Sequence, residues 1–294
     1  AAAAVLTAIV AIEEMPPGAR AWAIGVISMS FGFGSGLALL VLPLADLGRS
    51  GWRWLYVLGI LVVPAVARAA RRLPESRRFT AAMDGATREG HSPAGRRRLL
   101  VIGTGALLLA LFFTPAGQLQ NHYLSHERHL SALGISILEQ VAGTIGGLGT
   151  LLGGRLADAH GRRPVAIVGV ACGMLVTIAG YLSAGAALWV WMILGSLLSY
   201  AVVPALAVYG GELFPTGRRG RAGGILTVMA AAGGVLGLVA GGALTTAFGA
   251  TGPALAVLAA GPVALIVLIA VAYPETAREG LEDLNPEDTP QPRP

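Results

Sequence analysis

Long apolar segments separated by short charged ones run through most of the chain, and they constrain its fold more than any other feature. A helix needs roughly 20 apolar residues to cross the hydrocarbon core of a bilayer. Eight segments reach about that length: residues 21–44, 52–70, 99–118, 133–152, 165–184, 187–209, 223–246 and 253–273. The opening run, residues 1–12, is too short to span and is expected to be the end of a further helix. The sequence therefore predicts an all-α polytopic membrane protein.

Charge is scarce and unevenly placed. Only 13% of residues are charged, against about 25% in soluble domains. The net charge of +5 comes from arginines in the loops, so it indicates membrane topology rather than nucleic-acid binding. The single cysteine, Cys172, lies inside an apolar run, which favours a small packed residue over a redox role.

The arginines predict which side each loop faces. Loops on one side of the predicted spans hold eighteen of the 21: Arg20, nine between Arg68 and Arg98, Arg155, Arg162, Arg163, Arg218, Arg219, Arg221, Arg278 and Arg293. The opposite loops hold three, at Arg49, Arg53 and Arg128. Because loops rich in Lys and Arg stay in the cytoplasm, the first side and the C-terminus are expected to be cytoplasmic. A bacterial inner membrane is the expected location.

The densest of these loops is the segment from Gly154 to Pro164, predicted as a turn at the cytoplasmic surface between two spans. It carries the spacing G-x-x-x-D-x-x-G-R-R in Gly154, Asp158, Gly161, Arg162 and Arg163. This spacing resembles the loop motif of the major facilitator superfamily, found between the second and third helices of each six-helix half. Ala159 stands where the family usually has a basic residue.

An internal repeat extends the pattern. Glu13 precedes Arg20 by seven residues, Glu212 precedes Arg219 by seven, and each pair lies just before a span. Two helices later come the triplets Pro74-Glu75-Ser76 and Pro274-Glu275-Thr276, so equivalent positions are offset by 199 or 200 residues. Such a period indicates two parallel six-helix halves. The counterpart of Asp158 would fall before residue 1, so the chain is expected to run from the end of helix four to helix twelve of a twelve-helix protein.

The repeat predicts four segments. Residues 1–72 are expected to be the remainder of an N-terminal half, and residues 73–98 a cytoplasmic linker. Residues 99–273 are expected to form a complete C-terminal half, followed by an acidic cytoplasmic tail over residues 274–294.

The repeated pairs, the triplets and the run Glu212-Leu213-Phe214-Pro215-Thr216 together resemble the sugar-porter branch of that superfamily. The resemblance implies a two-half bundle in which a charged network latches the cytoplasmic ends together. It assigns this latch to Asp158, Arg162, Glu212, Arg219 and Glu275, with Glu13, Arg20 and Glu75 in the other half. From their chemistry, Asp158 is expected to accept backbone N–H groups at a helix N-terminus, and Arg162 and Arg163 to pair with Glu212 and Glu275. The alternative is that these are loop charges that serve only topology.

The sequence gives weaker indications of which residues bind the solute or a coupling proton. Glu139, next to Gln140, is the only charged residue well inside a predicted span, and such a carboxyl is costly there unless it has a function. We expect it to bind and release a proton during transport. The alternatives are that it lies in a wet outer vestibule or pairs with Arg128.

Neutral polar residues near the outer helix ends are further candidates for solute contact. Gln118, Gln120 and Asn121 follow a proline-containing break, and Ser199 and Tyr200 lie in the helix before Glu212. The alternative is that they are merely polar residues near water. Where sugar carriers have two glutamines this chain has Phe112 and Phe113, and Ala207 replaces an expected tryptophan, which puts a hexose in doubt. An organic acid, an aromatic acid or a drug-like solute is equally compatible.

One outer loop gathers His122, His126, Glu127 and His129. This spacing could bind a metal, although titrating histidines in a wet loop are the favoured interpretation. No cofactor or metal is therefore expected. No nucleophile, base and metal set is recognisable in the spans, so an enzyme is not expected.

The function that these patterns favour is secondary transport of a small organic solute by alternating access, coupled to a proton. The expected partners are the solute, the lipid bilayer and the coupling proton, with no nucleic acid. The alternatives are an uncoupled facilitator or efflux protein, a channel or receptor on the same bundle, or a fragment that does not transport alone.

Overall fold

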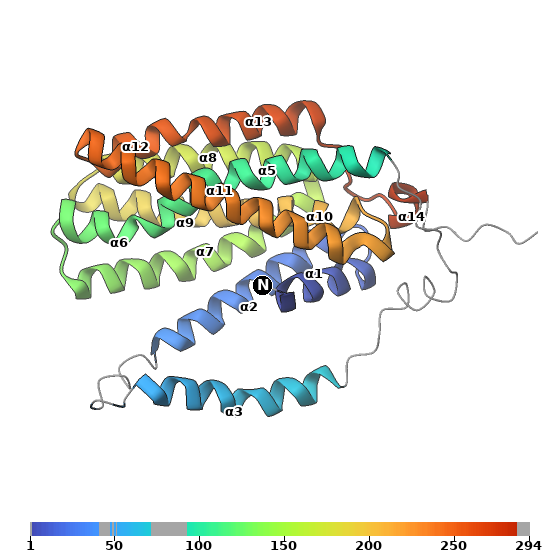
Figure 1. Ribbon diagram of the computed structural model, residues 1–294, viewed down its shortest axis with the longest axis horizontal. Coiled ribbons are helices and arrows are strands. Elements are labelled where there is room, and N and C mark those ends of the chain that lie inside the picture. The colour runs from blue at the N-terminus through green and yellow to red at the C-terminus, as the bar shows by residue number, and fades with distance from the viewer. Residues whose placement is uncertain (1, 41–47, 49, 51, 72–92, 287–294) are drawn as a thin grey trace, which may run out of the picture.

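Helices make up all the regular structure in the described part of the chain (Figure 1). The computed structural model describes residues 2–40, 48, 50, 52–71 and 93–286. The elements are α1 (Ala2–Glu14), α2 (Arg20–Leu40), α3 (Trp52–Ala70), α5 (Pro93–Gln118), α6 (Gln120–His122), the π-helix η2 (Tyr123–Glu127), α7 (Ala132–His160), α8 (Arg162–Leu182), α9 (Gly185–Ala207), α10 (Tyr209–Glu212), the 3-10 helix η3 (Thr216–Arg218), α11 (Arg219–Phe248), α12 (Thr251–Leu258), α13 (Ala260–Ala272) and α14 (Leu281–Leu284).

Six helical stretches among the described residues are long and apolar enough to cross a membrane. They are Gly95–Glu127, Ala132–His160, Arg162–Leu182, Gly185–Glu212, Thr216–Phe248 and Thr251–Ala272. Each contains most of one of the last six predicted spans. The predicted all-α, multi-pass membrane fold is confirmed.

The structure corrects the turn expected over residues 154–164. Helix α7 continues beyond residue 152 to His160, and the chain breaks only at Gly161, which has a φ of 104°. A helix satisfies its own backbone hydrogen bonds, so it can extend past the apolar segment into a charged one without a penalty. The motif therefore lies on the last turns of α7 and the first turn of α8. Helix α5 likewise begins at Pro93, within the segment expected to be a linker.

The helices pack in two groups. The first group is α1 and α2, which pack on each other, and the second comprises the helices from α5 to α13, in which α5 packs on α11, and α9 packs on both α7 and α8. Helix α2 joins the groups by packing on α7. A Cβ at Gly25 would lie 2.5 Å from the Thr150 carbonyl oxygen, and one at Gly154 would lie 2.6 Å from that of Ala21. The backbones of α2 and α7 therefore touch through glycines.

The bundle has two ends that differ in chemistry. We call the end where Glu13, Arg20, Asp158, Arg162 and Glu212 lie the charged end, and the end with His122, His126 and His129 the histidine end. Buried apolar side chains form one core cluster toward each end. Figure 1 shows α2 diverging from α7 away from the charged end, and α3 lying apart from the second group.

Candidate functional site

The centre of the charged end is the Glu212 carboxylate on α10, which is fully buried. Its Oε1 atom lies 3.0 Å from Nη2 of Arg162 and 3.3 Å from Nη1 of Arg20. Its Oε2 atom accepts a hydrogen bond of 2.6 Å from the Thr276 hydroxyl. One carboxylate therefore joins arginines from the first and second groups of helices.

A second ion pair crosses between the groups beside the first. Arg219 Nη1 lies 2.7 Å from Glu13 Oε1. Arg219 Nε donates to the carbonyl oxygens of Gly211 and Phe214, at 2.8 and 2.9 Å. Each glutamate of the repeated pairs thus contacts the arginine of the other repeat: Glu13 contacts Arg219, and Glu212 contacts Arg20.

Asp158, in the last turn of α7, binds the N-terminal end of α2. Its carboxylate accepts the backbone N–H groups of Ala21 and Trp22, at 3.3 and 2.8 Å. The Arg162 guanidinium lies 3.1 Å from the same carboxylate. Helix N-termini favour negative charge, and the contact expected from the sequence is present.

Glu275 contacts α8 differently from what the sequence suggested. Its carboxylate accepts the backbone N–H groups of Arg162 and Arg163, at 2.9 and 3.0 Å, and no ion pair with the Arg163 side chain forms. The Arg163 guanidinium donates instead to the Ala270 carbonyl. The expected side-chain pairing of Arg163 with Glu275 was wrong, because Gly161 ends α7 and leaves the first N–H groups of α8 facing this carboxylate.

The buried charges of the charged end balance. Three carboxylates and three guanidinium groups are at most 7% exposed, namely those of Glu13, Asp158, Glu212, Arg20, Arg162 and Arg219. Buried ions are tolerated when they are paired and hydrogen-bonded, and removing one partner leaves an uncompensated charge. The set therefore depends on contacts from both groups of helices. Glu75, the remaining predicted member, lies outside the described residues.

The segment after α13 closes over this cluster. The Asn285 amide donates to the Glu212 carbonyl at 2.7 Å, and Arg20 donates to the Glu279 carbonyl at 3.1 Å. Arg98, at the start of α5, donates to the Leu284 carbonyl. Sequence reasoning missed Asn285 and Thr276, although Thr276 belongs to the repeated triplet.

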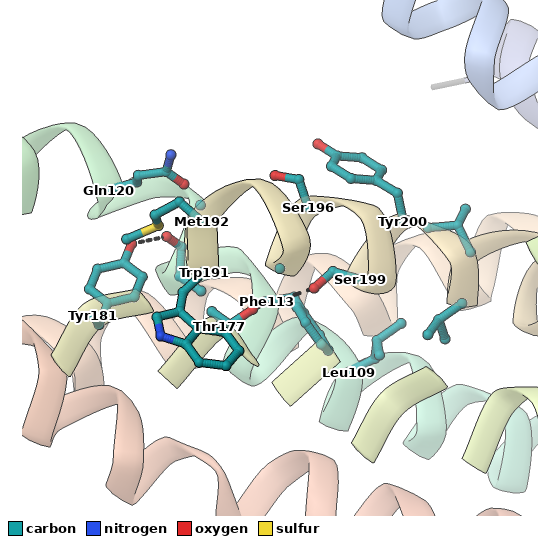
Figure 2. Close-up of a pocket in the computed structure, with 15 residues that line it drawn as sticks. Leu109, Phe113, Gln120, Thr177, Tyr181, Trp191, Met192, Ser196, Ser199 and Tyr200 are labelled. Atoms are coloured by element: carbon teal, nitrogen blue, oxygen red, sulfur yellow. Dashed lines mark hydrogen bonds between the residues drawn. The ribbon is translucent and has the colours of Figure 1, made fainter. Parts of the chain in front are cut away.

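A separate pocket lies in the second group, between α5, α8 and α9, with a volume of about 280 Å³. Figure 2 shows the ends of Gln120, Ser196 and Tyr200 on one side of α9 and the rings of Trp191 and Phe113 on the other. Further lining residues on α8 are Thr177 and Tyr181. The pocket combines aromatic walls with a few neutral polar groups, the usual composition of small-molecule sites.

The pocket gathers three of the seven residues proposed for solute or proton binding. Gln120, Ser199 and Tyr200 line it, and Gln118, Asn121, Glu139 and Gln140 do not. Gln118 and Asn121 are exposed near the end of α5 and on α6.

Glu139 and Gln140 are both exposed on α7. The Gln140 amide nitrogen lies 4.0 Å from a Cβ built at Gly36, so Gln140 faces α2. The suggested pairing of Glu139 with Arg128 is not formed among the described residues, where Arg128 Nε donates to the Tyr123 hydroxyl at 2.7 Å.

The histidine end is held together by contacts within the second group. Glu127 accepts the backbone N–H of Thr251 at 3.0 Å and also its hydroxyl. The rings of His122 and His126 stack with centroids 4.4 Å apart. Within the described residues, no three His, Cys, Asp or Glu side chains converge as a metal site would require.

Comparisons with known proteins agree on the architecture. A family model described as Major Facilitator Superfamily matches residues 112–293, whereas no curated protein matches the sequence. The solved structure of the proton:xylose symporter XylE bound to 6-bromo-6-deoxy-D-glucose superposes with a TM-score of 0.75 at 18% identity, over 97% of this chain and 70% of that one.

Two other transporters show the same fold. The E. coli fucose:proton symporter FucP gives a TM-score of 0.64 at 14% identity, over 90% of this chain and 72% of that one. A bacterial homologue of the iron transporter ferroportin, in an outward-facing state, gives 0.61 at 16% identity, over 88% and 65%.

Proposed function

The chain belongs to the major facilitator superfamily, and we propose that it is a secondary transporter that moves a small organic solute across the membrane by alternating access, driven by a proton gradient. Membrane transport follows from the family and the fold. The solute, the proton coupling and the roles of individual residues are the proposal.

The observation that carries the proposal is the reciprocal pairing at the charged end. Glu13 of the first repeat pairs with Arg219 of the second, and Glu212 of the second pairs with Arg20 of the first. A transporter built from two parallel halves needs contacts that join the halves at one end and can be exchanged for contacts at the other. Loop charges that served topology alone would not need to pair reciprocally while fully buried.

We assign the charged end to the cytoplasmic side, because most arginines lie in loops at that end. The C-terminus is then cytoplasmic, and a bacterial inner membrane fits the neighbouring transporters. The latch comprises Glu13, Arg20, Asp158, Arg162, Glu212, Arg219 and Glu275, with Gly154, Gly161 and Arg163 shaping the helix ends and Glu75 as a further member. Residues 1–72, 73–98, 99–273 and 274–294 are proposed as first half, linker, second half and tail.

Proton coupling rests on Glu139 and on the neighbours. XylE is a proton:xylose symporter and FucP is a fucose:proton symporter. Glu139 lies on α7 within a membrane-spanning stretch, and an ionisable residue at such a depth is a functional group by default. One observation favours an uncoupled facilitator as the second candidate: Glu139 is outside the lining of the pocket.

Uptake into proteoliposomes tests the proposal. The purified protein is reconstituted and offered a panel of radiolabelled organic solutes under an inward proton gradient, with and without a protonophore. We expect accumulation that the protonophore abolishes, and Glu139→Gln is expected to convert accumulation into equilibration. The matched control is Glu279→Gln, which removes an exposed carboxylate outside the spans and keeps the backbone carbonyl that Arg20 contacts. Equilibration by the unaltered protein, unchanged by the protonophore, would support the facilitator.

A further inference from the structure

The lining of the pocket between α5, α8 and α9 restricts the charge of its ligand. Among the described residues that line it, none carries Arg, Lys, His, Asp or Glu. Moving a carboxylate or an ammonium group out of water without a partner is costly. The lining therefore disfavours an ionised solute of either sign, unless aromatic faces compensate a cation.

Aromatic and thioether side chains form part of the pocket wall. Phe113 comes from α5, and Trp191, Met192 and Tyr200 come from α9. Phe, Tyr and Trp contribute large apolar areas and prefer edge or offset contacts with other rings. At about 280 Å³, the space is slightly smaller than the roughly 300–1,000 Å³ range for small-molecule pockets. A solute built around one ring suits both the walls and the size.

Few polar groups in this lining are available to a solute. The Thr177 and Ser199 hydroxyls lie 3.4 Å apart and bond to each other, and the Tyr181 hydroxyl donates to the Ala116 carbonyl. Within the described chain, the side chains of Gln120, Ser196 and Tyr200 make no hydrogen bond. Figure 2 shows these three ends on one side of α9, spread along the helix.

We propose that this pocket binds an uncharged, single-ring aromatic solute that carries one polar group, with its ring against Phe113 and Trp191. This inference rests on the proposed function, because it names the class of solute that the transporter carries. A hexose does not fit, since its several hydroxyls would face aromatic walls and lose hydrogen bonds to water without replacement. An organic acid does not fit either, since its carboxylate has no cation in the lining.

Four matched probes separate these classes. The purified protein in lipid nanodiscs is titrated by equilibrium dialysis with radiolabelled phenylacetamide, phenylacetate, 2-phenylethylammonium and D-glucose, and binding to empty nanodiscs is subtracted. The first three share a benzyl body and differ in charge. We expect phenylacetamide to bind about tenfold or more tighter than each of the others. The proposal is overturned if phenylacetate, 2-phenylethylammonium or D-glucose binds more tightly than phenylacetamide. It is also overturned if none of the four probes shows detectable binding.

Variants locate the binding. Trp191→Leu is expected to weaken phenylacetamide binding about tenfold, whereas Trp189→Leu, on the same helix but outside the lining, leaves it within about twofold. Ser196→Arg places a cation at the polar side and is expected to reverse the preference toward phenylacetate. Equal effects of the two tryptophan substitutions would overturn the assignment to this pocket.

The two proposals fail separately. Phenylacetamide that binds with the expected preference but is not taken up by proteoliposomes would contradict transport and leave the ligand class standing. If glucose or an organic acid is taken up even in the presence of excess phenylacetamide, the protein is a transporter but the proposed ligand class is wrong.

Discussion

The charged end and the histidine end of the bundle are built from different kinds of contact. At the charged end, buried ion pairs join α1 and α2 to elements of the second group: Glu13 to Arg219 and Arg20 to Glu212. At the histidine end, the described contacts of Glu127 and Tyr123 join elements of the second group to one another. Ion pairs thus join the two groups of helices at the end where the repeated motifs lie. The contacts at the histidine end stabilise the second group alone.

The buried charges at the charged end determine how the two groups of helices are positioned against each other. Buried ions are tolerated only in a paired and hydrogen-bonded geometry, so these pairs favour one position of the two groups. Between the ends, α2 and α7 touch through Gly25 and Gly154 and then diverge (Figure 1). Substitutions at the charged end should therefore alter both stability and the separation of the groups, and substitutions at the histidine end should alter neither by much.

The largest effect is expected from Glu212→Gln. The substitution leaves Arg20 and Arg162 buried beside a neutral amide, and removing one member of a buried ion cluster costs about 3–5 kcal/mol. The melting temperature of the detergent-purified protein should fall by about 6–20 °C. Glu279→Gln, at an exposed site after α13, is the control and should leave it unchanged. A stable Glu212→Gln protein would show that the cluster contributes little to joining the groups.

The Glu13–Arg219 pair should give the next largest effect. Glu13→Gln leaves Arg219 with the Gly211 and Phe214 carbonyls, so the expected loss is about 1.5–3 kcal/mol. Arg219→Gln in turn removes the guanidinium that pairs with the Glu13 carboxylate. The double variant should lose less than the sum of the single ones, with a coupling of about 0.5–3 kcal/mol. Additive losses in urea unfolding would mean that the two side chains do not interact.

Part of the charged end was predictable from sequence, and part was not. The residues of the repeated motifs identified Asp158, Arg162 and Glu212, because charged side chains at fixed spacing beside long apolar segments are conspicuous. The crossed pairing was not predicted, since a repeat shows which residues are equivalent and not which ones meet across the two groups. The Arg163–Glu275 pairing was mispredicted because backbone N–H groups, which every sequence contains, took the carboxylate.

The pocket was harder to predict. Gln120, Ser199 and Tyr200 stand out as polar residues in or beside apolar segments, and they do line it. Trp191 and Phe113 line it too, but the sequence alone suggests that an aromatic residue in a membrane helix only packs against its neighbours. Which apolar side chains face a cavity depends on how α5, α8 and α9 are rotated against one another, and no local pattern contains that information.

A smaller effect is expected from Gly154→Ala, which tests the contact between α2 and α7. A methyl group there would lie 2.6 Å from the Ala21 carbonyl oxygen, and such overpacking costs about 1–3 kcal/mol. We expect the charged end to loosen and the groups to approach at the other end, so the distance between spin labels at residues 33 and 137 should shorten. Gly143→Ala is the matched control on the same helix, because nothing lies within 4 Å of its Cβ position. Equal distance changes in both variants would show that the contact between Gly154 and Ala21 does not control the separation of the two groups.

The smallest effect is expected from Glu127→Gln at the histidine end. Glu127 accepts the Thr251 N–H at the start of α12, and an amide oxygen can still accept that bond. Only the attraction between the carboxylate charge and the helix N-terminus is lost, about 0.3–1 kcal/mol. Because both partners belong to the second group, the distance between labels at residues 33 and 137 should stay the same. A change in that distance as large as the one produced by Gly154→Ala would mean that the histidine end also sets the separation of the two groups, and the contrast between the ends would no longer hold.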